Sequence, residues 1–187
     1  MDYKIIGISG NPGTGKKTIA KLLANKIDYE LIILNDFAKE NNALKHISKN
    51  TEVVDEELVR KKLNNKIVKK TILAGHFLAD VIDQDSIDII IVLRCSPKEL
   101  IKRYTERKYE KNKIKNNLIT ELIGLISYEC IEKFGKKKIF ELNTTDIDPE
   151  ETVKIITSIL DSKEHKKNNI DWTSEYINDE NLRKYII

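Results

Sequence analysis

Cysteine is scarce in this sequence of 187 residues, and only Cys95 and Cys130 are present. Two cysteines are too few for a disulfide framework or a cysteine-based zinc site. We therefore expect both to be small buried side chains in a reducing environment. Long apolar runs are also missing, since no stretch approaches the ~20 residues that cross a membrane as a helix. The sequence thus predicts no membrane partner, no signal peptide before the first strand and a cytoplasmic location.

Glycine is scarce too, and four of the seven glycines lie within the first fifteen residues. Three of them belong to the turn 10–18, GNPGTGKKT, which stands between an apolar run at 3–9 and apolar residues at helical spacing in 19–27. Glycines let successive backbone N–H groups point inward, and a helix N-terminus attracts anions. This order predicts a phosphate-binding loop, with an ordinary Gly-rich turn as the alternative. The residues expected to hold phosphate are Gly10, Gly13, Thr14, Gly15, Lys16, Lys17 and Thr18.

One position of this loop departs from the usual pattern. Lys17 stands where Ser or Thr would ligate magnesium, and Thr18 comes one residue too late. The departure argues against a GTPase switch and only weakly against phosphoryl transfer. We expect Mg²⁺ to be held mainly by phosphates and water, with no direct metal ligand from the protein.

The formal net charge of +3 hides a strongly basic segment. From Arg94 to Leu118 there are nine Lys or Arg against three Glu, a local balance of +6, which leaves about −3 for the rest of the chain. Such a segment can be a solvated helix face, a nucleic-acid patch or a phosphate clamp.

Apolar patterning predicts one α/β domain with a five-stranded parallel sheet. The expected strands are 3–9, 29–34, 71–74, 87–93 and 138–142. The expected helices are 19–27, 35–40 with Asn35 or Asp36 as N-cap, 55–68 capped by Asp55, 98–107 capped by Ser96, 117–134, and one running to 160 capped by Asp148. Residues 41–54 are expected to be irregular, and 109–116 a short loop or lid.

Ligands of such a sheet bind at the carboxyl ends of its strands. The polar residues expected at that edge are Gly10–Lys16, Asn35, Asp36, His76, Arg94 and Asn143. Arg103 and Arg107 are four residues apart and share one helix face, where they can close over a transferring phosphoryl group. A solvated basic face is the alternative for both, and a structural ion pair is the alternative for Arg94.

Several motifs together resemble those of a known family. They are Gly10-x-Pro-Gly-x-Gly-Lys16, Asn35-Asp-Phe-Ala-Lys-Glu40, Asp55-Glu-Glu-Leu58, Gly75-His76, Val92-Leu-Arg94 and Arg103-x-x-x-Arg107-x-Tyr109. Over about 3–160 the chain resembles the adenylate-kinase-like P-loop proteins shared by archaea and eukaryotes, known in eukaryotes as a nuclear adenylate kinase and small-subunit ribosome assembly factor. The resemblance implies a three-layer fold of the P-loop nucleoside monophosphate kinase type.

That resemblance also implies an organisation and an activity. It implies a kinase-like domain at 1–161, with a monophosphate-binding segment near 30–53 and a lid near 106–116. The remainder, 162–187, has balanced charge and spaced aromatic residues, so we expect a surface appendage or a partly disordered tail. The implied reaction is ATP + AMP = 2 ADP with additional ATPase activity, and the implied partners are a platform ribosomal protein of the small subunit and rRNA. The alternatives are a ribosome-assembly ATPase whose output is hydrolysis, and another small-molecule P-loop kinase.

The resemblance assigns roles to single residues. Lys16, His76, Arg103 and Arg107 are the candidate catalytic residues, and Asp36 and Lys39 are the candidate acceptor-binding residues. His76 would orient water or nucleotide, with a purely structural histidine as the alternative, and Asp36 could equally be a helix cap. Two positions depart from the family pattern, because Ala74 stands where an acidic residue is usual and Lys39 where arginine is frequent.

Overall fold

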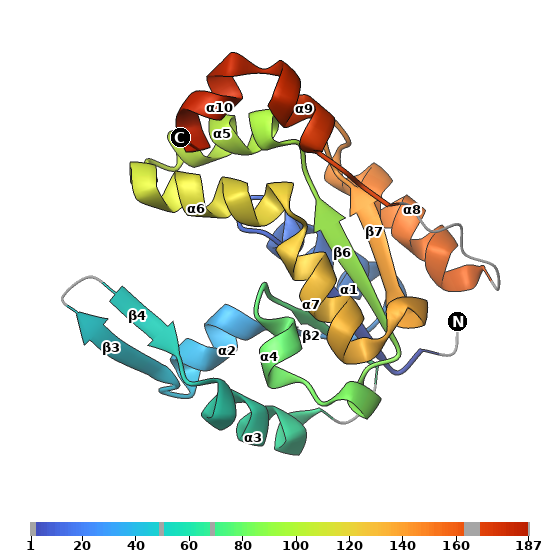
Figure 1. Ribbon diagram of the computed structural model, residues 1–187. Helices are drawn as coiled ribbons and strands as arrows, with labels where there is room; N and C mark the ends of the chain where they lie inside the picture. The colour runs from blue at the N-terminus through green and yellow to red at the C-terminus, as the bar shows by residue number, and fades with distance from the viewer. Residues whose placement is uncertain (1–2, 49–50, 68–69, 163–168, 187) are drawn as a thin grey trace.

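A central sheet of five parallel strands organises the computed structural model, which describes residues 3–48, 51–67, 70–162 and 169–186 (Figure 1). Its strands are β1 (Ile5–Gly10), β2 (Glu30–Ile33), β5 (Thr71–Ala74), β6 (Ile89–Arg94) and β7 (Ile139–Asn143). Their order across the sheet is β2-β5-β1-β6-β7, and all four neighbouring pairs are parallel. The predicted α/β fold with a five-stranded parallel sheet is confirmed.

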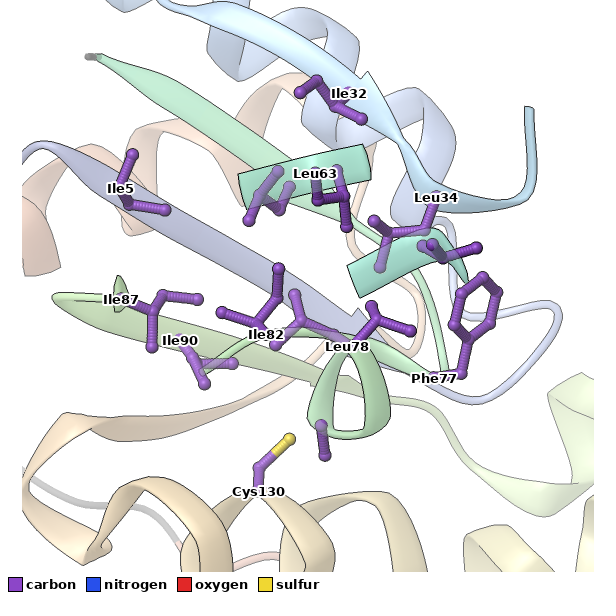
Figure 2. Close-up of a cluster of buried hydrophobic side chains, with 14 of the residues drawn as sticks. Ile5, Ile32, Leu34, Leu63, Phe77, Leu78, Ile82, Ile87, Ile90 and Cys130 are labelled. Atoms are coloured by element: carbon purple, nitrogen blue, oxygen red, sulfur yellow. The ribbon is translucent and has the colours of Figure 1, made fainter. Parts of the chain in front are cut away.

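Helices cover both faces of the sheet, and the three central strands β1, β5 and β6 are accordingly buried along their whole length. On one face, α1 (Lys16–Ile27) and α8 (Pro149–Asp161) pack Leu23 and Ile156 against Ile6 and Ile8 of β1. The other face carries α2 (Leu34–Glu40), α3 (Glu56–Lys66), α4 (Leu78–Val81) and α7 (Leu125–Phe134). Figure 2 shows this second cluster, to which Leu63 of α3, Leu78 of α4 and Cys130 of α7 belong together with Ile90 of β6. Both cysteines are buried, as expected.

A third apolar cluster lies beside the sheet and does not belong to either face. It joins α5 (Pro97–Glu106), α6 (Lys111–Leu122) and α10 (Glu180–Ile186) through Leu100, Tyr104, Leu118 and Leu182. Figure 1 shows α10 and α9 (Thr173–Asn178) lying over α5 and α6 at one end of the molecule. The C-terminal helices therefore rest on the same two helices that follow β6.

Three of the helix caps predicted from sequence, Asp55, Ser96 and Asp148, are present. Asp55 accepts a hydrogen bond from the backbone N–H of Leu58, at 3.2 Å, and begins α3. Ser96 caps α5 and is followed by Pro97 in the first helical position, and Asp148 caps α8 through two backbone N–H groups. These local signals are reliable because each one satisfies backbone donors that the helix itself leaves unpaired.

Two predictions near the N-terminal half are wrong. Helix α2 begins at Leu34, so Asn35 and Asp36 lie in its first turn and neither is its N-cap. Residues 41–54 are not simply irregular, because β3 (Leu44–Ser48) and β4 (Thr51–Val54) form an antiparallel hairpin. Residues 49–50 and Val68, which the sequence placed at the end of the helix now seen as α3, lie outside the described residues.

The predictions for 109–134 also need correction. Lys111–Asn116 are helical rather than a loop, and Ile114 and Leu118, one turn apart in α6, are both buried. The expected single helix 117–134 is divided at Gly124, which adopts φ +65° and starts α7. A side chain at Gly124 would lie 3.2 Å from Nη1 of Arg94, so the break follows from close packing as well as from backbone freedom. Within the described ranges, no helix is both long and apolar enough to cross a bilayer.

Candidate functional site

The loop between β1 and α1 has the conformation of a phosphate cradle. Gly10 has φ +132°, and a Cβ atom there would lie 2.2 Å from the carbonyl oxygen of Leu93. Gly13 has φ +88°, and a Cβ atom there would meet the Tyr104 ring at 2.9 Å. Helix α1 starts after Gly15 without a side-chain cap, so its first N–H groups remain available to an anion. The loop thus fits the phosphates of a nucleotide.

Helices α5 and α6 hold the backbone of this loop from outside. The Tyr104 hydroxyl donates to the carbonyl of Pro12 at 2.6 Å, and Nη1 of Arg103 donates to the carbonyl of Gly13 at 2.8 Å. From α6, the carbonyl of Asn117 accepts a hydrogen bond from Nδ2 of Asn11 at 2.6 Å. The carbonyl of Asn11 in turn accepts from Nζ of Lys16 at 2.7 Å and from Oγ1 of Thr14 at 2.9 Å.

The electrostatic environment of Lys16 is unusual for a lysine. Burial lowers the pKa of Lys16 to about 7; the negative charge of Glu121 opposes this shift and the positive charge of Arg107 adds to it. Burial, together with the nearby charge of Lys16, also lowers the pKa of His76 to about 4. At neutral pH His76 is therefore a neutral imidazole, whereas Lys16 titrates.

A large cavity of about 820 Å³ opens beside the loop. Parts of the loop, α2, the end of β5, α6 and α7 line it, and the residues that matter here are Lys16, Lys17, Asp36, His76, Arg107 and Asn117. The structure thus brings Lys16, Lys17, Asp36, His76 and Arg107, all of them predicted for the site, to one cavity. Lys39 is exposed on α2 and lies outside the described lining of this cavity.

A smaller cavity of about 320 Å³ lies on the other side of the loop. Thr18, Arg103 and Arg107 line it, together with Thr144 after β7 and Pro149 at the start of α8. Gly13 and Arg107 line both cavities. The phosphate loop is therefore flanked by two spaces, each within the size range of small-ligand sites.

Asp36 is engaged by the unusual lysine of the loop. Nζ of Lys17 lies 2.5 Å from Oδ2 of Asp36, and about half of each side chain is exposed. This ion pair joins the first turn of α1 to the first turn of α2 across the cavity. Ala74, in the position where an acidic residue was expected, is almost fully buried at the end of β5.

Arg94 and Asn143 do not face the cavity, although both end a strand at the expected edge. Arg94 is 3% exposed and pairs with Glu121 at 2.7 Å and with Glu141 at 2.5 Å, so the structural ion pair is the correct alternative for this residue. The Oδ1 atom of Asn143 accepts from the backbone N–H of Thr145 and shapes the following turn.

Sequence reasoning missed the contribution of α6. Lys113, Asn117 and Thr120 line the large cavity from one face of that helix, at the i, i+4, i+7 spacing that was overlooked because 109–116 looked like a loop. Lys113 lies over the ring of Tyr109, 4.3 Å from its centroid, and that ring stacks on Tyr104. The connection after α5 is thereby folded back onto the helix that supports the loop.

The donor set of this site favours a metal that arrives with the nucleotide. In the described part of the chain, no group of three or more His, Cys, Asp or Glu side chains could enclose a metal ion. Lys17 replaces the usual hydroxyl ligand, and the carboxylate of Asp36 is already paired with it. The residues present fit Mg²⁺ bound through phosphate oxygens and water rather than by a protein carboxylate.

Comparison with known proteins finds sequence relatives that cover most of the chain. A family model described as AAA domain matches residues 6–124. The chain is 37% identical over 176 residues to a protein of Pyrococcus abyssi (strain GE5 / Orsay) named "Putative adenylate kinase", with 92% of this chain and 93% of that protein covered. A protein of the same name from Methanosarcina acetivorans is 37% identical over 186 residues, with 90% and 97% covered.

Solved structures of kinases share the fold. Shikimate kinase from Bacteroides thetaiotaomicron superposes with a TM-score of 0.59 at 20% identity, over 86% of this chain and 99% of that chain. Deoxyadenosine kinase from M. mycoides with bound dATP superposes with a TM-score of 0.54 at 19% identity, over 84% and 100%. The chain thus shares the overall fold of these two kinases.

Proposed function

This chain belongs to the AAA domain family and to the family of archaeal proteins named putative adenylate kinases, and from that premise we propose that it is an ATP-dependent nucleotide kinase. Its reaction is the transfer of the γ-phosphoryl group of ATP to AMP, which gives two molecules of ADP. The position of the phosphate loop between two cavities supports this proposal best, because a phosphoryl transfer needs a donor and an acceptor on either side of the transferred group.

In this proposal the smaller cavity takes the adenosine part of ATP. Its lining combines loop backbone with the side chains of Arg103, Thr144 and Pro149, and it leads directly to the first turn of α1. The triphosphate then follows the loop, with the γ-phosphate at Lys16. AMP occupies the larger cavity, where Lys17, Asp36 and the α6 residues supply polar contacts. Lys39, exposed on α2, is proposed to meet the acceptor only on closure.

The transfer itself requires positioning and charge stabilisation more than covalent help from the protein. A phosphate oxygen of AMP attacks the γ-phosphorus, and the bond from that phosphorus to the β–γ bridging oxygen breaks. Lys16 stabilises the charge that develops on the γ-phosphate, and Arg107 closes over it from the end of α5, where it lines both cavities. Bound Mg²⁺ would add further neutralisation of phosphate charge.

The deciding experiment is an acceptor screen with purified protein. ATP is offered with AMP, CMP, UMP, GMP or shikimate, and ADP formation and the phosphorylated product are both measured. The expected result is transfer to AMP that far exceeds transfer to the other acceptors and that is lost in Lys16→Ala. Absence of AMP-dependent turnover in the folded parent protein would overturn the proposal.

ATP hydrolysis is a second candidate output, and one observation favours it. His76 faces the large cavity as a neutral imidazole, so its ring can accept a hydrogen bond from a water molecule near the γ-phosphate.

The family resemblance adds a role in maturing small-subunit rRNA with a platform ribosomal protein. The exposed Arg107, Lys108 and Lys111 between α5 and α6 offer cations for such a partner. Turnover of ATP alone, with and without small ribosomal subunits, tests both parts.

A further inference from the structure

The C-terminal segment enters a buried ionic cluster that lies directly behind the site. Three charged side chains form the cluster, Arg94, Glu121 and Glu141, and all of them are almost fully buried. One arginine against two carboxylates leaves an excess of one negative charge. A buried carboxylate is tolerated only when hydrogen-bond donors compensate for its lost water. The donors that surround this cluster therefore decide whether α6, which carries Glu121, stays in place.

Two of these donors come from the C-terminal segment. Nε1 of Trp172 donates to Oε1 of Glu121 at 3.1 Å, and the backbone N–H of Ile170 donates to Oε2 of Glu141 at 3.0 Å. The carbonyl of Ile170 also accepts from Nη1 of Arg94, at 3.3 Å. The segment thus contributes to every member of the cluster.

Helices α9 and α10, which follow in the chain, make further contacts between this segment and α5 and α6. Leu182 of α10 is 1% exposed and packs in the cluster that contains Tyr104 and Leu118. At the start of α5, Oγ of Ser96 donates to Glu175 at 2.6 Å, and Lys98 pairs with Asp179 at 2.9 Å. Figure 1 shows the resulting arrangement, in which α9 and α10 lie across α5 and α6 on the side away from the sheet.

The opposite sides of α5 and α6 hold the phosphate loop. Tyr104 and Arg103 donate to the carbonyls of Pro12 and Gly13, and the carbonyl of Asn117 accepts from Asn11. Glu121 follows Asn117 by one helical turn, so a shift of Glu121 moves Asn117 as well. A continuous chain of contacts therefore runs from Trp172 through Glu121 and Asn117 to the loop.

We propose that Trp172 is a positioning residue for the ATP site, and that the segment 170–186 holds α5 and α6 in the arrangement that shapes the phosphate loop. The proposal rests on the proposed function only in taking ATP as the ligand of that loop. Reciprocity follows from linkage, since a segment that favours ATP binding must itself respond when ATP binds.

Trp172 is the only tryptophan, so its fluorescence reports on this segment alone. The first measurement is a titration of the parent protein with ATP and magnesium while Trp172 emission is followed. We expect a saturable change in emission whose midpoint matches the ATP affinity found by equilibrium dialysis, and a much weaker response in Lys16→Ala. Unchanged emission at ATP concentrations that saturate the dialysis signal would overturn the proposal. This measurement needs no AMP and stays decisive if AMP transfer is absent.

The second measurement uses Trp172→Phe, which removes the N–H donor and keeps an aromatic ring. The expected result is a five- to tenfold rise in the KM for ATP or an equal fall in kcat, with the KM for AMP unchanged within twofold. Lys184→Ala, at an exposed position of α10, is the matched control and should behave as the parent does. If Trp172→Phe lowers only the melting temperature and leaves kcat and the KM for ATP unchanged, the segment is purely structural and the proposal fails.

Discussion

Lys17 and Asp36 form an ion pair of 2.5 Å between the first turns of α1 and α2. The pair joins the donor side of the site to the acceptor side. It also explains how the loop tolerates a lysine in place of the usual magnesium-binding hydroxyl, because the extra cation is neutralised by a carboxylate of the protein. Removal of either partner should therefore change the net charge next to the bound nucleotide and its metal.

The pair predicts opposite effects for its two members. Lys17→Met leaves an unpaired carboxylate that repels nucleotide, so turnover should require about two- to fivefold more magnesium. Asp36→Asn leaves an unpaired cation and should lower the requirement by a similar factor, whereas the double variant should resemble the parent. Magnesium titrations of turnover for the four proteins test this. Equal shifts in the same direction for both single variants would show that the pair has no part in handling charge.

Lys16→Ala should abolish most turnover and leave the fold intact. Lys16 contacts the loop carbonyl of Asn11 and lines the cavity, so its charge faces ligand rather than core. Losing one preorganised charge-stabilising group commonly costs ~10²–10³ in rate. Circular dichroism should be unchanged, and Lys21→Ala, at an exposed position of α1, is the control. Near-parental turnover in a folded Lys16→Ala protein would remove Lys16 from the mechanism.

The lowered pKa of Lys16 predicts that ATP binding takes up a proton at alkaline pH. Without ligand, Lys16 has a pKa of about 7 and is mostly neutral at pH 8, whereas bound phosphates favour its charged form. The affinity for ATP should therefore fall as pH rises above 7, by at most about tenfold per pH unit. Below pH 7 the protonation of Lys16 should leave the affinity nearly unchanged. Calorimetric titration at pH 8 in two buffers of different ionisation enthalpy measures the uptake. Lys16→Met should show none, and a parent protein that also shows none would contradict the prediction.

Much of the fold could be predicted because its signals are local. The strands are short apolar runs, and the caps Asp55, Ser96 and Asp148 mark where helices begin. The prediction failed where polar composition outweighed weak periodicity. In the first two turns of α6, only Ile114 and Leu118 are buried. The other residues of these turns are polar or charged, so the apolar spacing typical of a helix was too weak to recognise.

Within the site, only the residues of the loop motif could be placed reliably from the sequence. The loop residues were identified because glycines and Lys16 occur at a fixed spacing, but the partners of Asp36 and Arg94 depend on contacts between distant segments. Glu121 and Trp172 meet across a separation of 51 residues, and no pattern in the sequence indicates that pairing. Long-range electrostatic pairing thus decided which polar strand ends face ligand and which are structural.

Arg107 and Arg103 should respond differently to substitution. Arg107 is exposed at the end of α5 and lines both cavities, so a role as phosphate clamp would require its fork, and Arg107→Lys should lose activity as well as Arg107→Ala. Arg103 is held by Glu99 and by the carbonyl of Gly13, so Arg103→Ala should disturb the loop and raise the KM for ATP. Steady-state kinetics separate the two, and equal turnover for Arg, Lys and Ala at 107 would indicate a solvated basic face.

The last prediction concerns the buried cluster around Arg94. Arg94→Met removes the only cation of the cluster and leaves Glu121 and Glu141 buried together, which should cost about 3–5 kcal/mol of unfolding free energy.

The loss should depend on pH in a definite direction. Without the arginine, two buried carboxylates are left with no counter-charge, and this penalty applies only while both are ionised. The stability of Arg94→Met should therefore be closest to that of the parent near pH 4 and fall further below it as the pH rises. Denaturant unfolding between pH 4 and 8 measures this difference, and Arg94→Met/Glu141→Gln should recover part of it because one buried charge is gone. A deficit that is constant across this range would mean that Arg94 contributes packing and hydrogen bonds rather than charge.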